Sequence, residues 1–165
     1  MKLVTRLLHE NAKLPERGHD IDVGLDVFVP EAGVLYPGPN MIPLGFSIDV
    51  PIGYSAEIRP RSGMASGSKT KDFVVHGATH FTIRDTGNKE RGIGIIAQSP
   101  PIDPGYIGEV HAIVINTSDI AIDYPEHTRF GQLVVYPVVY AIPSESVDDS
   151  RKANGFGSTG AGAKQ

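Results

Sequence analysis

The carboxyl-terminal residues 151–162 combine one guanidinium, one aromatic ring and a run of glycines and small hydroxyl residues. Such a segment has little apolar area to bury and cannot build a packed core. A glycine-rich backbone can instead lie flat against a ligand and offer N–H groups to phosphate oxygens. Phe156 could then cover a flat base while Arg151 forms paired hydrogen bonds with a phosphate. The alternative is a frayed, flexible tail, and only the rest of the chain can decide between the two.

A second group of polar residues follows a predicted strand. Arg61, Ser62 and the N–H of Gly63 could together hold an anion, although this tripeptide is common in proteins. Asp26 lies in the alternating segment 23–29, opposite the face that carries the valines and the leucine. A lone acid in a strand is most often a solvated, outward-facing residue, so the residues alone leave the role of Asp26 open.

A third group lies at a predicted turn. The dipeptide Pro104-Gly105 is typical of a turn, which predicts a β-hairpin formed by residues 93–103 and 106–116. Asp103 and Tyr106 then lie at the tip of this hairpin. A carboxylate at such a tip is well placed to accept a proton at short range.

Length and composition limit the elements that can position these groups. The chain has 165 residues, enough for one domain with its own core, and its 19 glycines and 13 prolines favour short strands joined by turns. The net charge of −4 lacks the basic excess of a general nucleic-acid-binding protein. We find no apolar run that could span a bilayer, no signal peptide and no cysteine for disulfides or thiolate metal sites. We therefore expect neither nucleic acid nor a membrane as a partner, and a location in the cytoplasm, or in the host cell interior for a viral protein.

The pattern along the chain predicts an all-β domain over residues 1–143, built as a sandwich or barrel. A polar linker and the flexible, glycine-rich tail follow over residues 144–165. Residues 64–92 are polar and rich in turns, and we interpret them as an inserted hairpin or lid. No segment has a convincing helical period.

Five separated segments, in this order, resemble the motif series of the trimeric deoxyuridine triphosphatases (dUTPases). They are residues 23–27, 60–63, 102–109, 129–133 and 151–160. No one of them is decisive, but five in the right order over nearly the whole chain are a strong signal. The resemblance implies a distorted jelly-roll or β-barrel protomer and a homotrimer with three sites at subunit boundaries. It also implies Mg²⁺-dependent hydrolysis of dUTP to dUMP and pyrophosphate, which keeps uracil out of DNA and supplies dUMP for thymidylate synthesis.

The resemblance assigns the chemistry to the predicted hairpin. Asp103 is implied to orient and activate the water that attacks the α-phosphorus. Tyr106 is implied to lie against the deoxyribose, where a ribose 2′-hydroxyl would collide with the ring. The hairpin backbone, at Ile102 and Gly105, is implied to bind the edge of uracil, and such a site rejects a mismatched edge because its own polar groups would stay unpaired.

The resemblance also implies where the phosphates and the metal lie. Arg61, Ser62, Gly63 and Gln132 are expected to hold the phosphates, with Ser62 nearest the bond that is broken. Asp26 is expected to reach Mg²⁺ only through its water shell, as suits a cation that loses water reluctantly.

The tail is implied to close over the substrate. Arg151, Ser158 and Thr159 are expected to bind the γ-phosphate, while Phe156 stacks on uracil and Gly157 lies beside it. Its ordering would exclude water from the site. In the family the hairpin, the phosphate loops and the tail come from three subunits, so a single chain is expected to hold no complete site.

The sequence departs from the family pattern in three places. Leu25 replaces a usual tyrosine, and Lys152 and Asn154 replace usual glycines. The distance along the sequence between the second and third motifs is longer than usual, and the extra chain lies in residues 64–92. We predict that this insert is a surface hairpin that leaves the chemistry intact and could contact another protein.

Two other functions are compatible with such a fold. A dCTP deaminase, or a bifunctional deaminase–dUTPase, would need a catalytic glutamate in an arrangement that we do not find. A regulatory or scaffold protein could bind a partner through the insert, with or without turnover. The intact Asp103, Tyr106, Arg151 and Phe156 argue against a loss of activity, because a pure binding module does not need them.

Overall fold

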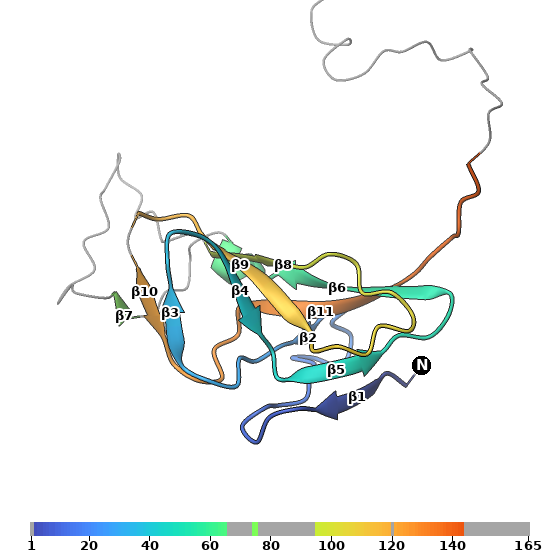
Figure 1. Cartoon of the computed structure of the whole chain (residues 1–165), viewed down its shortest axis with the longest axis horizontal. Helices are drawn as coiled ribbons and strands as arrows, with labels where there is room; N and C mark the ends of the chain where they lie inside the picture. The colour runs from blue at the N-terminus through green and yellow to red at the C-terminus, as the bar shows by residue number, and fades with distance from the viewer. Residues whose placement is uncertain (1, 66–73, 76–94, 120, 144–165) are drawn as a thin grey trace, which may run out of the picture.

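The structure is a computed structural model that describes residues 2–65, 74–75, 95–119 and 121–143. Within these ranges the chain forms short strands and one four-residue helix, α1 (Ser62–Ala65) (Figure 1). The strands are β1 (Val4–Leu7), β2 (Leu25–Asp26), β3 (Gly33–Leu35), β4 (Gly38–Pro43), β5 (Phe46–Asp49), β6 (Tyr54–Pro60), β7 (Val74–Val75), β8 (Ile95–Gln98), β9 (His111–Asn116), β10 (Ile122–Tyr124) and β11 (Gly131–Pro137). No helix in the described part is long and apolar enough to cross a membrane. The predicted all-β class is confirmed.

The described strands pair antiparallel, in three sheets of three strands and one pair. Their orders are β4-β9-β8, β2-β11-β6, β3-β10-β7 and β1-β5. Strand β8 contacts both β6 and β11, so the first two sheets pack against each other, and β3, β10 and β7 lie together at one end of the molecule (Figure 1). This layered antiparallel arrangement is a distorted jelly roll, as the resemblance implied.

Alternation of side chains along the strands builds the core between the layers. In β9 every second residue is buried, and Ala112 and Val114 are fully inside. The strand ends on Asn116, whose buried amide donates a hydrogen bond to the carbonyl of Leu35 at 3.3 Å. The largest fully buried side chains are Phe46, Phe130, Leu35, Leu44, Ile58, Ile95, Ile122 and Leu133.

The ladder between β6 and β11 brings the second and fourth motifs together. It runs from Gly131 opposite Pro60 to Pro137 opposite Tyr54. Gly131 is required by close packing, because a Cβ there would lie 2.7 Å from the Cγ2 atom of Ile58. One residue later, β11 also pairs with β2, so that Gln132 lies between the two neighbouring strands.

The predicted hairpin is confirmed, but its paired strands are shorter than expected. Strand β8 pairs with β9 from Ile95 opposite Asn116 to Gln98 opposite Ile113, and residues 99–110 form a long loop. This loop leaves the hairpin because its backbone pairs elsewhere: Ile102 bridges to Ala56 of β6. The turn after Asp103 is present, because the N–H of Tyr106 donates to the Asp103 carbonyl at 3.2 Å.

The alternating segment 23–29 is less regular than predicted. Only Leu25–Asp26 forms a strand, and Val23, expected on the apolar face, is 74% exposed. Val27 and Val29 are buried as expected. Their N–H groups donate hydrogen bonds to the carbonyls of Gly131 and Thr128, and these bonds hold the segment against the core.

Two predicted segments lie largely outside the described residues. Of the insert 64–92, the structure describes the end of α1 and strand β7, which pairs with β10. The linker and tail over 144–165 are not among the described residues, and neither are the predicted ligands Arg151, Phe156, Gly157, Ser158 and Thr159.

Tyr124 fills the junction between β10 and the segment before β11. Its ring packs edge-on against Phe130, with centroids 5.0 Å apart, and the residue is only 9% exposed. Burial raises the pKa of the Tyr124 phenol above its ordinary value, and the charge of Glu31 adds to this rise.

Tyr124 should therefore make the fold sensitive to alkali. Above about pH 10 the unfolded phenol loses its proton while the folded phenol keeps it, so stability falls by up to about 1.4 kcal/mol per pH unit. Urea unfolding at pH 8 and pH 10.5 should show a smaller alkaline loss in Tyr124→Phe than in the wild type. The exposed Tyr36 provides the matched control, Tyr36→Phe. Equal alkaline losses in all three proteins would contradict this account.

Candidate active site

One carboxylate lies between two guanidinium groups where β2, β6 and β11 meet. Oδ1 of Asp26 is 2.9 Å from Nε of Arg61, and Oδ2 is 3.0 Å from a terminal nitrogen of Arg129. The Asp26 side chain is only 17% exposed, so it is not the solvated residue that an isolated acid in a strand usually is. Two positive charges share one negative charge, and the cluster keeps an excess of positive charge.

Backbone contacts hold the two arginines in this arrangement. Arg61 also donates a hydrogen bond to the carbonyl of Arg129 at 3.3 Å. Arg61 follows the last residue of β6, and Arg129 precedes the start of β11 by two residues, so the β6–β11 ladder fixes their separation. The sequence analysis quoted Arg129 within a motif but gave it no role. Its position in that motif could have marked Arg129 as a candidate site residue.

The cluster borders an open cavity of about 790 Å³ whose lining is mostly polar. Ser62, at the start of α1, faces this cavity together with Arg61. The other lining residues are Gly18, His19, Asp22, Val23, Gly24, Asp26, Arg59, Pro60, Arg129, Gln132, Val134 and Tyr136. Four of the predicted site residues, at positions 26, 61, 62 and 132, therefore meet here, and such a set of groups can bind a polyanion.

Gln132 lines this cavity and is held by contacts with its neighbours. Its amide nitrogen donates to the Pro60 carbonyl at 3.1 Å. Its carboxamide lies across Gly24, where any Cβ would overlap the side-chain oxygen. Gly24 is thus a site residue that sequence analysis missed, although it belongs to the first motif. Of the predicted ligand Gly63, the structure gives only its place in α1.

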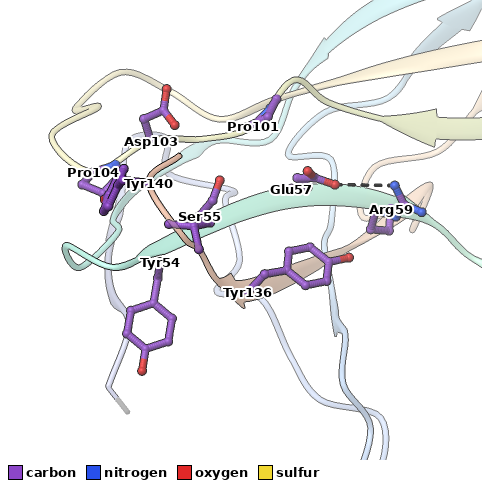
Figure 2. A pocket seen from close by; sticks show the side chains of 10 residues that line it. Tyr54, Ser55, Glu57, Arg59, Pro101, Asp103, Pro104, Tyr136 and Tyr140 are labelled. Carbon is purple, nitrogen blue, oxygen red and sulfur yellow. Dashed lines mark hydrogen bonds and ion pairs between the residues drawn. The ribbon is translucent and has the colours of Figure 1, made fainter. Parts of the chain in front are cut away.

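Asp103 lies in a different cavity, of about 540 Å³, shown in Figure 2. In that view Asp103, Pro104 and Tyr140 gather at one end, and the pair formed by Glu57 and Arg59 lies at the other. Asp103 is exposed on the loop above β6, a position from which its carboxylate can meet a ligand.

The loop that carries Asp103 is held firmly on its amino-terminal side. Ile102 is buried and exchanges two backbone hydrogen bonds with Ala56, at 2.7 and 3.1 Å. Gly105 adopts a positive φ of 87°, which the turn requires and which side chains rarely tolerate. Tyr106 is 46% exposed, so its ring is available to a ligand.

Within one chain, Asp103 does not line the cavity that is bordered by Arg61, Ser62 and Gln132. Asp103 follows Ile102, and Ile102 pairs with Ala56 of β6. Arg61 comes five residues after Ala56, just beyond the end of this strand. Five residues of strand span about 16 Å. Among the described residues, only Arg59 and Tyr136 border both cavities. A reacting atom held by Ser62 would therefore be out of reach of Asp103 of the same chain.

Comparisons with known proteins give a consistent result. Residues 86–160 match the family model for dUTPase. The deoxyuridine 5′-triphosphate nucleotidohydrolase of Clostridium tetani is 32% identical over 163 residues, which cover 96% of each chain. The enzyme of the same name from Bdellovibrio bacteriovorus is 37% identical over 143 residues, 83% of this chain and 80% of the relative.

Solved structures have the same fold. The dUTPase of Staphylococcus bacteriophage 80alpha, solved with dUpNHpp, superposes with a TM-score of 0.71 at 23% identity, over 97% of this chain and 99% of that chain. A mutant dUTPase of phage phi11 of S. aureus, described with a structural Mg(II) ion, has a TM-score of 0.65 at 24% identity, over 90% and 97% of the two chains.

Removing the acid between the two arginines should destabilise the fold. Asp26→Asn leaves the partly buried guanidinium group of Arg61 and the exposed one of Arg129 without their shared counter-charge. We expect a loss of about 1–3 kcal/mol in the free energy of unfolding. Urea denaturation measures this loss. Asp20→Asn, an exposed acid in the neighbouring loop, is the control and should stay within about 0.5 kcal/mol of the wild type. Equal stability of the two variants would show that Asp26 does not hold the cluster.

Proposed function

This chain belongs to the dUTPase family, and from that premise we propose that it hydrolyses dUTP to dUMP and pyrophosphate. Such an activity keeps uracil out of DNA and supplies dUMP for thymidylate synthesis. The observation that carries the proposal is the convergence of Arg61, Arg129, Ser62 and Gln132 on one cavity with an excess of positive charge. We place the enzyme in the cytoplasm, or in the interior of a host cell.

The cavity supplies what a triphosphate requires. Its phosphates carry several negative charges, and guanidinium groups bind phosphate oxygens with paired, charge-assisted hydrogen bonds. Arg61 and Arg129 are already held by Asp26 and by the backbone, so they need little reorganisation when the substrate binds. Ser62 contributes a hydroxyl next to Arg61, beside the α-phosphate.

Asp103 acts as the general base. Cleavage of the bond between the α- and β-phosphates requires a water molecule in line with the leaving pyrophosphate. The Asp103 carboxylate accepts the proton of this water as its oxygen attacks the α-phosphorus, and pyrophosphate leaves with the electrons of the broken P–O bond. The backbone at Ile102 and Gly105 reads the edge of uracil, and Tyr106 contacts the sugar.

A complete site requires more than one copy of the chain. The distance of about 16 Å between the Asp103 loop and Arg61 along one chain supports this conclusion. We propose a homotrimer in which the loop of one copy lies against the phosphate cavity of the next, and the tail 144–165 of the third closes over the substrate. Exposed apolar side chains beyond β11, at Val139, Tyr140 and Ile142, support such an assembly, since contact with another copy would cover them.

Mg²⁺ fits this arrangement as a partner of the substrate. Among the described residues no group of three or more His, Asp or Glu side chains could cage a metal ion. Mg²⁺ at a triphosphate needs no such cage, because phosphate oxygens and water supply most of its ligands. Asp26 faces the cavity with a carboxylate that could receive hydrogen bonds from those waters. The ion would neutralise charge that develops on the leaving pyrophosphate.

The insert 64–92 remains a predicted contact for another protein. Its described parts are the end of α1 and strand β7, and β7 extends the sheet beside β10. Strand β7 belongs to a different sheet from β6, the strand that precedes Arg61, which is consistent with an insert that leaves the chemistry intact.

The proposed activity is tested by release of pyrophosphate from dUTP, dTTP, dCTP and UTP, with ammonia measured in parallel. The wild type should turn over dUTP alone and release no ammonia, which excludes a deaminase. Asp103→Asn should lower kcat by about 10²–10⁴-fold, because the water loses its base. Asp49→Asn, an exposed acid on β5, should leave the rate unchanged. Comparable rates on all four nucleotides would contradict the proposal.

A further inference from the structure

The loop that carries Asp103 and Tyr106 is held at its carboxyl-terminal side by the side chain of Glu109 and by the backbone of Val110. The Glu109 side chain is 22% exposed. Oε1 of Glu109 accepts a hydrogen bond from the backbone N–H of Gly45 at 2.8 Å. The same oxygen lies 3.1 Å from Nε2 of His9, and because a carboxylate oxygen only accepts, this histidine nitrogen is the donor. Glu109 thus joins the loop to two other segments of the chain.

The place to which Glu109 is attached is itself rigid. The N–H of Leu44 donates to the Val110 carbonyl at 3.0 Å, and the N–H of Val110 donates to the Phe46 carbonyl at 2.8 Å. Gly45 lies between these two contacts with a φ of 75°, which presents its N–H to Glu109. The carboxylate therefore receives a donor whose position the turn between β4 and β5 has already fixed.

Glu109 also holds the ring of Tyr106. The phenol hydroxyl donates to the backbone carbonyl of Glu109 at 2.8 Å. The ring folds back over Gly108, where a Cβ would lie 2.7 Å from the phenol Cζ atom. The free edge of the tyrosine is thus tied to the same residue whose side chain ties the loop to Gly45 and His9.

We infer that Glu109 is a positioning residue that fixes the Tyr106 ring and so sets the preference for deoxyribose over ribose. This inference rests on the proposed function, in which the Tyr106 ring lies against the sugar. A ring that is tied at its hydroxyl cannot swing aside to admit a 2′-hydroxyl. When the tie is loosened, the ring gives way to the larger sugar, and contact with deoxyribose weakens at the same time.

The test compares kcat and KM for dUTP and for UTP in a set of variants. Glu109→Ala removes the side-chain contacts, and Tyr106→Phe keeps the ring but removes its hydrogen bond. Each should lower the ratio of kcat/KM for dUTP to that for UTP by about 10-fold. The change for dUTP should appear mainly in KM, because the ring contacts the sugar and not the reacting phosphorus.

Three measurements separate positioning from a general loss of structure. Partial unfolding lowers both activities equally and leaves the ratio unchanged, whereas a displaced ring changes the ratio. Glu109→Gln retains an oxygen that can accept from Gly45 and should keep the ratio within about 3-fold of the wild type. In the double variant Tyr106→Phe with Glu109→Ala, the ratio of kcat/KM for dUTP to that for UTP should fall no further than in either single variant. Both substitutions act through the same ring, so their effects should not add.

Glu10→Ala removes an exposed acid beside His9 and should leave the ratio unchanged. His9→Ala removes one of the two contacts to Oε1 and should lower the ratio by about 2–3-fold, so it and Tyr106→Phe carry the test if Glu109→Ala does not fold. If the wild type prefers dUTP and a folded Glu109→Ala variant keeps the same ratio, the inference is overturned but the proposed function is not. A wild type that does not hydrolyse dUTP would overturn the proposed function as well.

Discussion

The shared carboxylate of Asp26 is the interaction on which the cavity lined by Arg61 and Arg129 depends. Without it, Arg61 and Arg129 would be neighbouring like charges with no shared counter-charge, and they would repel each other. With it, two guanidinium groups stay close and the cluster keeps a net positive charge for a polyanion. The β6–β11 ladder makes this geometry possible, because it brings residues more than seventy positions apart in sequence into register. The fold and the anion site are therefore stabilised by the same contacts.

The second constraint is the separation of the chemical groups within one chain. The loop that carries Asp103 is fixed at Ile102 by β6 and at Glu109 by the turn between β4 and β5. Neither attachment allows the loop to travel along β6 to Arg61. We propose that the loop with its exposed carboxylate and the cavity lined by Arg61 and Arg129 are complementary surfaces that meet between different copies of the chain. In the proposed trimer, assembly places the base beside the phosphates, and each copy contributes to more than one site.

Much of the fold could be predicted from the sequence because its strands alternate regularly. The pattern from His111 to Asn116 and the turn at Pro104-Gly105 predicted the pairing of β8 with β9 correctly. The prediction extended these strands too far, because the loop 99–110 finds backbone partners on β6 and β5 that no local pattern reveals. The pairing of Asp26 with Arg129, 103 positions away, was hidden for the same reason. Motif order predicted which residues form the site, but only the three-dimensional arrangement places Asp103 in one cavity and Asp26, Arg61, Ser62 and Gln132 in another.

The division of one site between copies is the central claim, and mixing of subunits tests it most directly. Arg61→Ala and Asp103→Asn chains are each expected to be inactive alone. Denatured together in equal amounts and refolded, they should recover about a quarter of the wild-type activity, because one site in four then pairs an intact Asp103 loop with an intact Arg61 cavity from another copy. Refolded trimers that contain both chains and hydrolyse no dUTP would contradict the account.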